Sequence, residues 1–444
     1  MPSTRVEGSP GTWHNNISGR IVQGRPPFRV VNDDRSGGAG SASRRLRIVL
    51  YSHDTMGLGH IRRNLLIAQA LSTSRLSPDV LLVTGAREAG SFSMPPGVDC
   101  LILPSLFKEP NGRYRSRRLR VSLRELINVR QNVLQASIRA FEPDVFIVDN
   151  VPRGVAGELD STLDLLRAGK RTRCVLGLRD VRDEPAAVAR EWRLKRSEEA
   201  IRRYYEKIWV YGDAAVYDPV KEYRYPSDMA EKVSYTGYLD QRVRLEAAEK
   251  SSGGASLALP VVPKGRFALC LVGGGQDGGR LVEAFAQSRF PSGMAGVIVT
   301  GPHMDAAVQQ RLIARASQNP QLQVMGFVTE PTALLRCADC VVAMGGYNTT
   351  CEILSFGKRA LIVPRVTPRK EQLIRAQRLQ GLGVLDMVHP DKLSIPFLNT
   401  WLQNNAGLWP VKNVHDQIDM KGLDRMPQLL EDLVHGRSSE AQIQ

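Results

Sequence analysis

Three glycine-rich loops bear side chains that could bind an anion or move a proton. Residues 53–60 (HDTMGLGH) end in His60, whose neutral imidazole could take a proton from a hydroxyl group. Residues 273–279 (GGGQDGG) offer backbone N–H groups that could wrap a diphosphate. Residues 345–352 (GGYNTTCE) end in Glu352, a carboxylate that could hold two ribose hydroxyls. These residue types favour a site for a phosphorylated ligand that carries hydroxyl groups.

Each loop also has a structural interpretation. The first could be a tight turn in which His60 bonds to the backbone, and His53 is more typical of a structural histidine. The second could be a flexible connection, but such glycine density costs stability where no ligand needs it. In the third, Thr349 and Thr350 can open a helix and donate hydroxyls to phosphate, whereas Glu352 could simply complement the helix dipole. Neither a dinucleotide fingerprint nor a P-loop is present.

Short apolar runs alternate with helical patterns along most of the chain, which predicts the elements that hold these loops. We expect helices over about 61–71 and 122–141. The strands of a first sheet are expected at 47–51, 80–83, 100–103, 144–149, 173–178 and 207–211, and those of a second at 267–272, 296–301, 323–327, 340–344 and 360–364. The fold class is therefore α/β, with two Rossmann-like doubly wound domains and a cleft at the carboxyl ends of their strands.

Composition divides the chain into five parts. A disordered basic tail rich in Gly, Ser, Pro and Arg precedes the first strand, and a Ser/Gly/Pro-rich linker interrupts the alternation. The predicted parts are the tail at 1–44, an N-terminal acceptor-binding domain at 45–241, the linker at 242–264, a C-terminal nucleotide-sugar-binding domain at 265–395 and a helical segment at 396–444.

These three loops, together with a fourth polar stretch at residues 364–372 after the next strand, resemble the GT-B glycosyltransferases, and most of all the MurG-like group with a family-28 C-terminal domain. The resemblance covers roughly residues 46–395. His60 matches the histidine that ends the family's acceptor loop, Ser234–Tyr238 resembles the Thr-Gly segment that closes its N-terminal domain, and Glu352 matches its ribose-binding glutamate. The resemblance implies transfer of a sugar from a nucleotide-sugar donor, with UDP as the expected nucleotide.

The resemblance also implies the residues of the donor site. Residues 327–329 fall where the family's backbone contacts the base, and Glu371 with Gln372 resembles its acidic-Gln pair near the donor sugar, although both could be ordinary helix-start residues. The expected donor-binding residues are Gly273, Gly274, Gly275, Val328, Gly345, Gly346, Asn348, Thr349, Thr350, Glu352, Glu371 and Gln372.

The acceptor side departs from the family. MurG-like enzymes have a second glycine-rich loop where this chain has Asn150-Val151-Pro152-Arg153-Gly154, so the acceptor's identity does not carry over. The acceptor could be a glycan, a lipid or a small molecule. The expected acceptor-binding residues are Gly57, Gly59, Asn150 and Arg153, with His60 as the catalytic base.

The chain carries a formal net charge of +15, which favours anionic partners. Part of this charge lies in one stretch that could contact anionic membrane lipid or could be a solvated surface; its residues are Arg113, Arg115, Arg117, Arg118 and Arg120. The sequence has no signal core and no transmembrane run, so we expect a cytoplasmic protein, peripheral at the inner face of the membrane if it binds lipid. Nucleic acid ranks low, because no RNA-recognition motif or zinc finger is present.

We therefore predict an inverting glycosyltransferase in which His60 helps to deprotonate an acceptor hydroxyl. No metal or cofactor is expected, because helix N-termini and loop amides would stabilise the departing diphosphate and no Asp-x-Asp motif occurs. Cys337 and Cys340 have the spacing of half a metal site but no complementary pair, so we interpret them as packed thiols. Two alternatives remain: a nucleotide-sugar epimerase or hydrolase on the same fold, and a non-catalytic basic protein that binds membrane or RNA.

Overall fold

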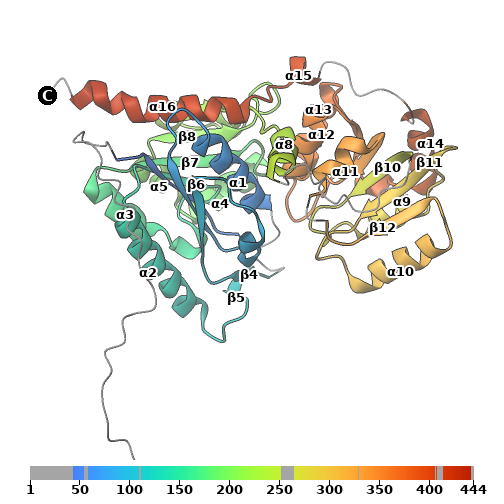
Figure 1. The fold of residues 1–444 in the computed structure, drawn as a ribbon, viewed down its shortest axis with the longest axis horizontal. Coiled ribbons are helices and arrows are strands. Elements are labelled where there is room, and N and C mark those ends of the chain that lie inside the picture. Colours follow the sequence, from blue (N-terminus) through green and yellow to red (C-terminus); the bar gives the residue numbers. More distant parts are fainter. Residues whose placement is uncertain are drawn as a thin grey trace, which may run out of the picture. The chain divides into compact units, whose positions relative to one another are not determined.

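The structure, a computed structural model, describes residues 44–444 except 55–58, 110–111, 252–264, 329, 406, 408–413 and 442–444. The predicted tail at 1–44 thus lies almost wholly outside the described residues, as does Gly57. From Arg45 onward the chain forms one unit, in which two parallel sheets follow one another (Figure 1). The predicted α/β class with two doubly wound sheets is confirmed.

The first sheet has seven parallel strands in the order β3-β2-β1-β6-β7-β8-β9. Their bounds are β1 Arg47–Ser52, β2 Asp79–Thr84, β3 Val98–Ile102, β6 Val145–Asp149, β7 Arg173–Arg179, β8 Lys207–Tyr211 and β9 Val233–Tyr235. Strand order reverses beside β1, which pairs with both β2 and β6. The carboxyl ends of β1 and β6 therefore border the crevice where ligands bind in such sheets.

The second sheet has six parallel strands in the order β12-β11-β10-β13-β14-β15. Their bounds are β10 Arg266–Leu271, β11 Met294–Val299, β12 Leu322–Met325, β13 Cys340–Ala343, β14 Arg359–Ile362 and β15 Asp386–Met387. The reversal falls beside β10, so the glycine-rich loop after β10 and the motif after β13 are neighbours. A small antiparallel hairpin, β4 Leu106–Lys108 with β5 Tyr114–Ser116, lies outside both sheets.

Helices cover both faces of each sheet, because the strands are apolar on both sides. In β1, Ile48 and Leu50 belong to one core cluster while Val49 and Tyr51 belong to another, as the two-residue period of a strand requires. The first-half helices are α1 Gly59–Ser72, α2 Leu123–Phe141, α3 Asp160–Gly169, α4 Pro185–Leu194, α5 Ser197–Tyr204, α6 Pro219–Glu222 and α7 Ser227–Ala230.

The remaining helices begin in the region predicted as a linker. They are α8 Arg242–Ser251, α9 Gly279–Ala286, α10 Ala306–Ser317, α11 Thr332–Cys337, α12 Tyr347–Ser355, α13 Glu371–Gly381, α14 Ile395–Asn405, α15 Val414–Gln417 and α16 Gly422–Ala441. The last of these packs against α1 of the first half (Figure 1). Among the described helices, none is both long and apolar enough to cross a membrane.

Candidate active site

A cavity of about 340 Å³ lies at the carboxyl ends of strands from both sheets. From the first half it is lined by the start of α1 and by Arg179 at the end of β7; from the second, by the loops after β10, β11 and β13 and by Arg365 after β14. Ligand sites in doubly wound folds occupy this position. The predicted site residues that line the cavity are Gly59, His60, Gly273, Gly274, Gly275, Val328, Gly346, Asn348, Thr349, Glu352 and Gln372.

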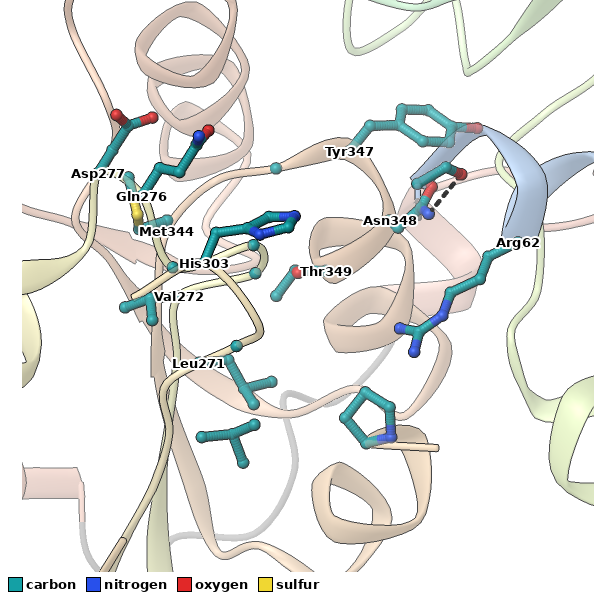
Figure 2. A pocket seen from close by; sticks show the side chains of 18 of the residues that line it. Arg62, Leu271, Val272, Gln276, Asp277, His303, Met344, Tyr347, Asn348 and Thr349 are labelled. Atoms are coloured by element: carbon teal, nitrogen blue, oxygen red, sulfur yellow. Dashed lines mark hydrogen bonds between the residues drawn. The ribbon is translucent and has the colours of Figure 1, made fainter. Parts of the chain in front are cut away.

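Two backbone features of the cavity suit an anion. Gly273 and Gly275 have φ values of 59° and 92°, and a Cβ on Gly275 would lie 2.3 Å from the Thr300 carbonyl oxygen, so only glycine fits that position. The N-terminus of α12 follows Gly346, which has no capping side chain. Free N–H groups at a helix N-terminus bind phosphate, and Figure 2 shows Thr349 of this helix beside His303.

Glu352 lies at the wall of the same cavity, where it is buried and paired with the guanidinium of Arg244. Its Oε1 accepts hydrogen bonds from Arg244 Nη1 at 3.0 Å and from Thr332 Oγ1 at 3.4 Å. Burial raises the pKa of the Glu352 carboxyl, while Arg244 and Arg62 oppose that shift. Arg244 also bonds to Glu330 at 2.7 Å, and Figure 2 shows Arg62 reaching into the cavity from α1.

His60 is the second residue of α1 and is oriented by a buried carboxylate. Its Nδ1 lies 2.5 Å from Oδ2 of Asp149, the last residue of β6. Arg63 Nη2 donates to both Asp149 oxygens, at 2.8 and 2.6 Å. Although burial alone would raise the pKa of Asp149, Arg63 and His60 hold that pKa well below its ordinary value. An ionised Asp149 keeps the proton on Nδ1, which leaves Nε2 free to accept one.

The histidine loop and the donor motif are joined directly. Asn348 Nδ2 donates to the Gly59 carbonyl oxygen at 2.9 Å (Figure 2). This contact joins the start of α1, which bears His60, to the start of α12 at the same cavity, although Gly59 and Asn348 are almost 290 positions apart in the sequence. The arrangement can hold a base and an anionic group in one cavity.

Three of the predicted donor residues lie behind the cavity wall. Thr350 is buried, and Gly345 presents its carbonyl oxygen to Arg375 Nη1 at 3.0 Å. Glu371 is buried too and accepts a hydrogen bond from Arg365 at 2.5 Å, although its second oxygen has no partner. Arg365 itself lines the cavity, whereas Glu371 does not. Glu371 therefore contacts a residue of the cavity wall without lining the cavity.

Of the predicted acceptor residues, only Gly59 lines the cavity, since Gly57 is outside the described part of the chain. Asn150 has a φ of 70° and accepts two hydrogen bonds from Arg182, at 2.8 and 3.1 Å. Arg153 bonds to Asp160 at 2.8 Å. Both side chains are thus engaged within the first half.

Sequence reasoning missed several charged residues at or beside the cavity. Among them are Arg62, Arg63, Asp149, Arg179 and Arg244. Two of these residues could have been found from the sequence. Arg63 is three positions after His60 on a helix, and Asp149 ends a strand that a doubly wound order places beside β1. Arg179 has no ion pair among the described residues, and its Nε is buried without a partner.

The basic stretch, for which membrane contact and a solvated surface were both open, runs from the residue before β5 through β5 and into the turn after it. Arg113, Arg115, Arg118 and Arg120 are exposed and Arg117 is half-buried. Leu119 and Val121 are exposed beside them.

Part of the second half of the chain is similar to a known family. Residues 268–400 match the family described as glycosyltransferase family 28 C-terminal domain. A stretch of 144 residues is 25% identical to the UDP-N-acetylglucosamine–N-acetylmuramyl-(pentapeptide) pyrophosphoryl-undecaprenol N-acetylglucosamine transferase of Alkaliphilus oremlandii (strain OhILAs). That match covers 31% of this chain and 39% of the relative's length.

Solved structures share the fold along most of the chain. The glycosyltransferase of kitacinnamycin superposes with a TM-score of 0.59 at 16% identity, covering 88% of this chain and 100% of its own. The UDP-GlcNAc 2-epimerase of Methanocaldococcus jannaschii also gives a TM-score of 0.59, at 12% identity, covering 87% of this chain and 99% of its own. The predicted resemblance to the family-28 C-terminal domain is confirmed over residues 268–400, and the two-domain GT-B fold is confirmed along most of the chain.

Proposed function

We propose that this protein transfers a sugar from a UDP-sugar donor to a hydroxyl group of an acceptor, with inversion at the anomeric carbon. The observation that carries the proposal is that the His60–Asp149 pair faces the same cavity as the glycine-rich loop and Glu352. A base alone, or a phosphate site alone, would be compatible with many activities. Together they supply the two groups that a direct displacement at a nucleotide sugar requires.

The acceptor hydroxyl gives its proton to His60 Nε2 as its oxygen attacks the anomeric carbon. Asp149 stabilises the imidazolium that forms, since its carboxylate is ionised and in contact with Nδ1. The bond from the anomeric carbon to the diphosphate breaks at the same time. The α12 N-terminus, the loop at Gly273–Gly275 and the unpaired Arg179 can stabilise the charge that develops on the leaving group.

Glu352 supports the assignment of the donor as a nucleotide. Its buried carboxylate has one oxygen engaged by Arg244 and Thr332 at the cavity wall, which fits a carboxylate that clasps ribose hydroxyls. Val328 lies at the same wall next to Phe327, where backbone groups could contact a base. The relative from Alkaliphilus oremlandii bears a name that includes a UDP-sugar, which supports UDP as the nucleotide.

The donor site is tested by calorimetric titration of the purified protein with UDP and other nucleoside diphosphates. We expect selective UDP binding that weakens by about tenfold or more in Glu352→Gln, because a neutral amide accepts ribose hydrogen bonds less strongly. Glu88→Gln, which removes an exposed carboxylate elsewhere, serves as the matched control. Equal affinity in the two variants would contradict the donor assignment.

The catalytic assignment is tested by UDP release from UDP-sugars in the presence of a panel of acceptors. His60→Ala should lower turnover by about a hundredfold or more and leave UDP binding intact. Normal turnover in that variant would rule out His60 as the base. The acceptor-free reaction must be followed as well, because a UDP-GlcNAc 2-epimerase shares this fold. An isomerised donor or free sugar without any acceptor would favour the epimerase or hydrolase alternative.

The acceptor side is proposed to operate at a membrane surface in the cytoplasm. The exposed arginines Arg113, Arg115, Arg118 and Arg120, together with Leu119, could bind anionic lipid, each charge contributing about 1 kcal/mol. Sedimentation with vesicles of phosphatidylglycerol should retain the protein at low salt and release it at high salt. Equal retention by neutral phosphatidylcholine vesicles would contradict this part of the proposal.

A further inference from the structure

His303, in the loop after β11, lines the donor cavity and has no part in the chemistry proposed above. The residue is exposed. Among the residues that the structure describes, none forms a hydrogen bond or an ion pair with its imidazole. The ring is therefore available to a ligand that enters the cavity.

The loop that carries His303 packs tightly against the glycine-rich loop after β10. The backbone N–H of His303 donates to the Gly274 carbonyl oxygen at 2.9 Å. Gly301 has a φ of 77°, and a Cβ there would lie 2.2 Å from the Gly273 carbonyl oxygen, so only glycine lets the two backbones approach this closely. These contacts hold the backbone of residue 303 at the edge of the glycine-rich loop.

The imidazole lies close to both backbone features that suit an anion. A Cβ on Gly274 would lie 3.8 Å from Cδ2 of the ring, so the ring borders the glycine-rich loop. Figure 2 shows the ring beside Thr349, which belongs to the first turn of α12. A diphosphate that contacts both the loop and the N–H groups of this turn would therefore lie next to the imidazole.

The carboxylates on the elements around the ring have other partners. Asp277 of the glycine-rich loop pairs with Arg365, of the loop after β14, at 3.1 Å. Asp305 caps the N-terminus of α10, and Glu352 of α12 pairs with Arg244 at 3.0 Å. The first half of the chain adds three arginines to the cavity wall. A bound diphosphate would thus supply the negative charge that stabilises an imidazolium here.

We infer that His303 binds the diphosphate of the donor nucleotide as an imidazolium, through a charge-assisted hydrogen bond. The inference rests on the proposed function, because it adds a side chain to the proposed donor site. A histidine ordinarily loses its proton near pH 6.5, so the ring takes up a proton at neutral pH when a neighbouring anion favours the charged form. His303 and His60 then have separate roles: His303 holds positive charge at the leaving group, and His60 accepts the proton of the acceptor hydroxyl.

The test is calorimetric titration of the full chain with UDP and with uridine at pH 7.5, in two buffers of different ionisation enthalpy. The pair of buffers gives the number of protons taken up on binding. His303→Gln should weaken UDP binding by about fivefold or more, lower the proton uptake and leave uridine binding unchanged, because uridine lacks the diphosphate. The phosphate of UDP contributes its own protons equally in every variant. His303→Lys, with a permanent charge, should bind UDP as the wild type does but without the extra proton uptake.

His435→Gln provides the matched control, because His435 is exposed on α16 and does not line the cavity. The inference is overturned if His303→Gln behaves like His435→Gln, or if it weakens uridine and UDP equally. A loss of UDP affinity without a change in proton uptake would overturn it too, since the ring would then bind in its neutral form. A wild-type protein that does not bind UDP would contradict the proposed function and the inference with it, whereas UDP binding that His303→Gln leaves unchanged contradicts the inference alone.

Discussion

The chemistry proposed for His60 depends on Asp149, because a free imidazole could carry its proton on either nitrogen. The contact from Nδ1 to the buried carboxylate selects one tautomer, and Arg63 keeps that carboxylate ionised. Arg63 is itself held between the aromatic rings of Tyr211 and Tyr347, with its Cζ 5.8 and 5.5 Å from their centroids. The base is thus positioned by one chain of contacts from β6 and β8 to α12.

Asp149→Asn should test this chain of contacts. The amide keeps the shape of the carboxylate but cannot stabilise the imidazolium, so UDP release in the presence of acceptor should fall by about a hundredfold or more. UDP affinity should stay unchanged, because Asp149 does not line the donor cavity. Asp164→Asn, at an exposed carboxylate, is the control. A variant with full turnover would show that Asp149 has only a structural role.

His53 predicts a pH dependence of stability. Burial holds the pKa of His53 well below its ordinary value, so the folded protein keeps the ring neutral. The unfolded chain binds a proton below about pH 6.5. The stability contributed by a neutral His53 is therefore complete above that pH and is lost as the pH falls toward the folded pKa, by up to about 1.4 kcal/mol per pH unit.

Urea unfolding at pH 7 and at pH 5.5 measures this loss. We expect His53→Asn to reduce the difference in the free energy of unfolding between the two pH values, whereas His435→Asn, at an exposed histidine of α16, should leave it unchanged. If His53→Asn shows the same difference in the free energy of unfolding between the two pH values as the wild type, groups other than His53 cause the pH dependence.

The sequence predicted the backbone of this site better than its charges. Gly273, Gly346 and Glu352 stand in local motifs, and local motifs are visible without a fold. Arg179 and Arg365 reach the cavity only because β7 and β14 end there, and the pairing of Arg244 with Glu352 joins residues more than a hundred positions apart. Such contacts depend on tertiary packing, and the local patterns of a single sequence do not predict which distant residues pack together.

At the scale of elements, α8 links the predicted linker to the donor site. The helix begins at Arg242, and its third residue, Arg244, bonds to Glu352 of α12 and to Glu330 ahead of α11. The linker region therefore contributes a side chain that controls the charge of the proposed ribose-binding carboxylate. Composition alone indicated only a connection, because charged residues at 242–250 are as common in linkers as in exposed helices.

Arg244→Gln should make UDP binding weaker and more dependent on pH. Burial already raises the pKa of Glu352, and Arg244 opposes that shift. Without Arg244 the pKa rises further, so a larger fraction of Glu352 is protonated at pH 6 than at pH 8. The ratio of the Kd values for UDP at these two pH values should then be larger than in the wild type.

Arg242→Gln is the matched control for this experiment. Arg242 lies two residues earlier on the same helix, but its guanidinium bonds to Asp240 at 2.8 Å and is exposed. It should leave the ratio of Kd values unchanged. Identical pH dependence in Arg244→Gln and the wild type would contradict the role given to Arg244.

The long strands and helices were predictable because each carries its own periodic pattern. The short ones were not: β9 has three residues, β15 has two, and the β4–β5 hairpin has three in each strand. Strands of that length show no recognisable alternation, and they form because neighbours supply hydrogen bonds.

At the scale of the whole molecule, the ion pairs between the first half and the segment 369–378 share one polarity. In each pair the acid belongs to the first half and the base to the segment 369–378 of the second. The pairs are Asp180–Arg375, Glu184–Lys370, Glu191–Arg369 and Glu222–Arg378. The same segment carries Gln372 of the cavity wall, so these pairs hold a part of the proposed donor site against the half that bears His60.

Asp180–Arg375 should dominate the energetics of this contact. Both side chains are buried, their N–O distance is 2.6 Å, and Asp180 also accepts from Tyr238 at 2.7 Å. Arg375→Met leaves Asp180 buried without a counter-charge, which should cost about 3–5 kcal/mol of stability. Arg378→Met removes a partly exposed pair from the same helix and should cost about 0–1 kcal/mol.

Scanning calorimetry of the full chain compares the two variants. Because the buried pair links the halves, its loss should also make their unfolding less cooperative. We therefore expect Arg375→Met to unfold in two transitions, whereas the wild type and Arg378→Met unfold in one. UDP should raise only the transition of the second half in Arg375→Met, since the glycine-rich loop and Glu352 both belong to that half. A single transition that is lowered no more than in Arg378→Met would mean that apolar packing, and not this ion pair, couples the two sheets.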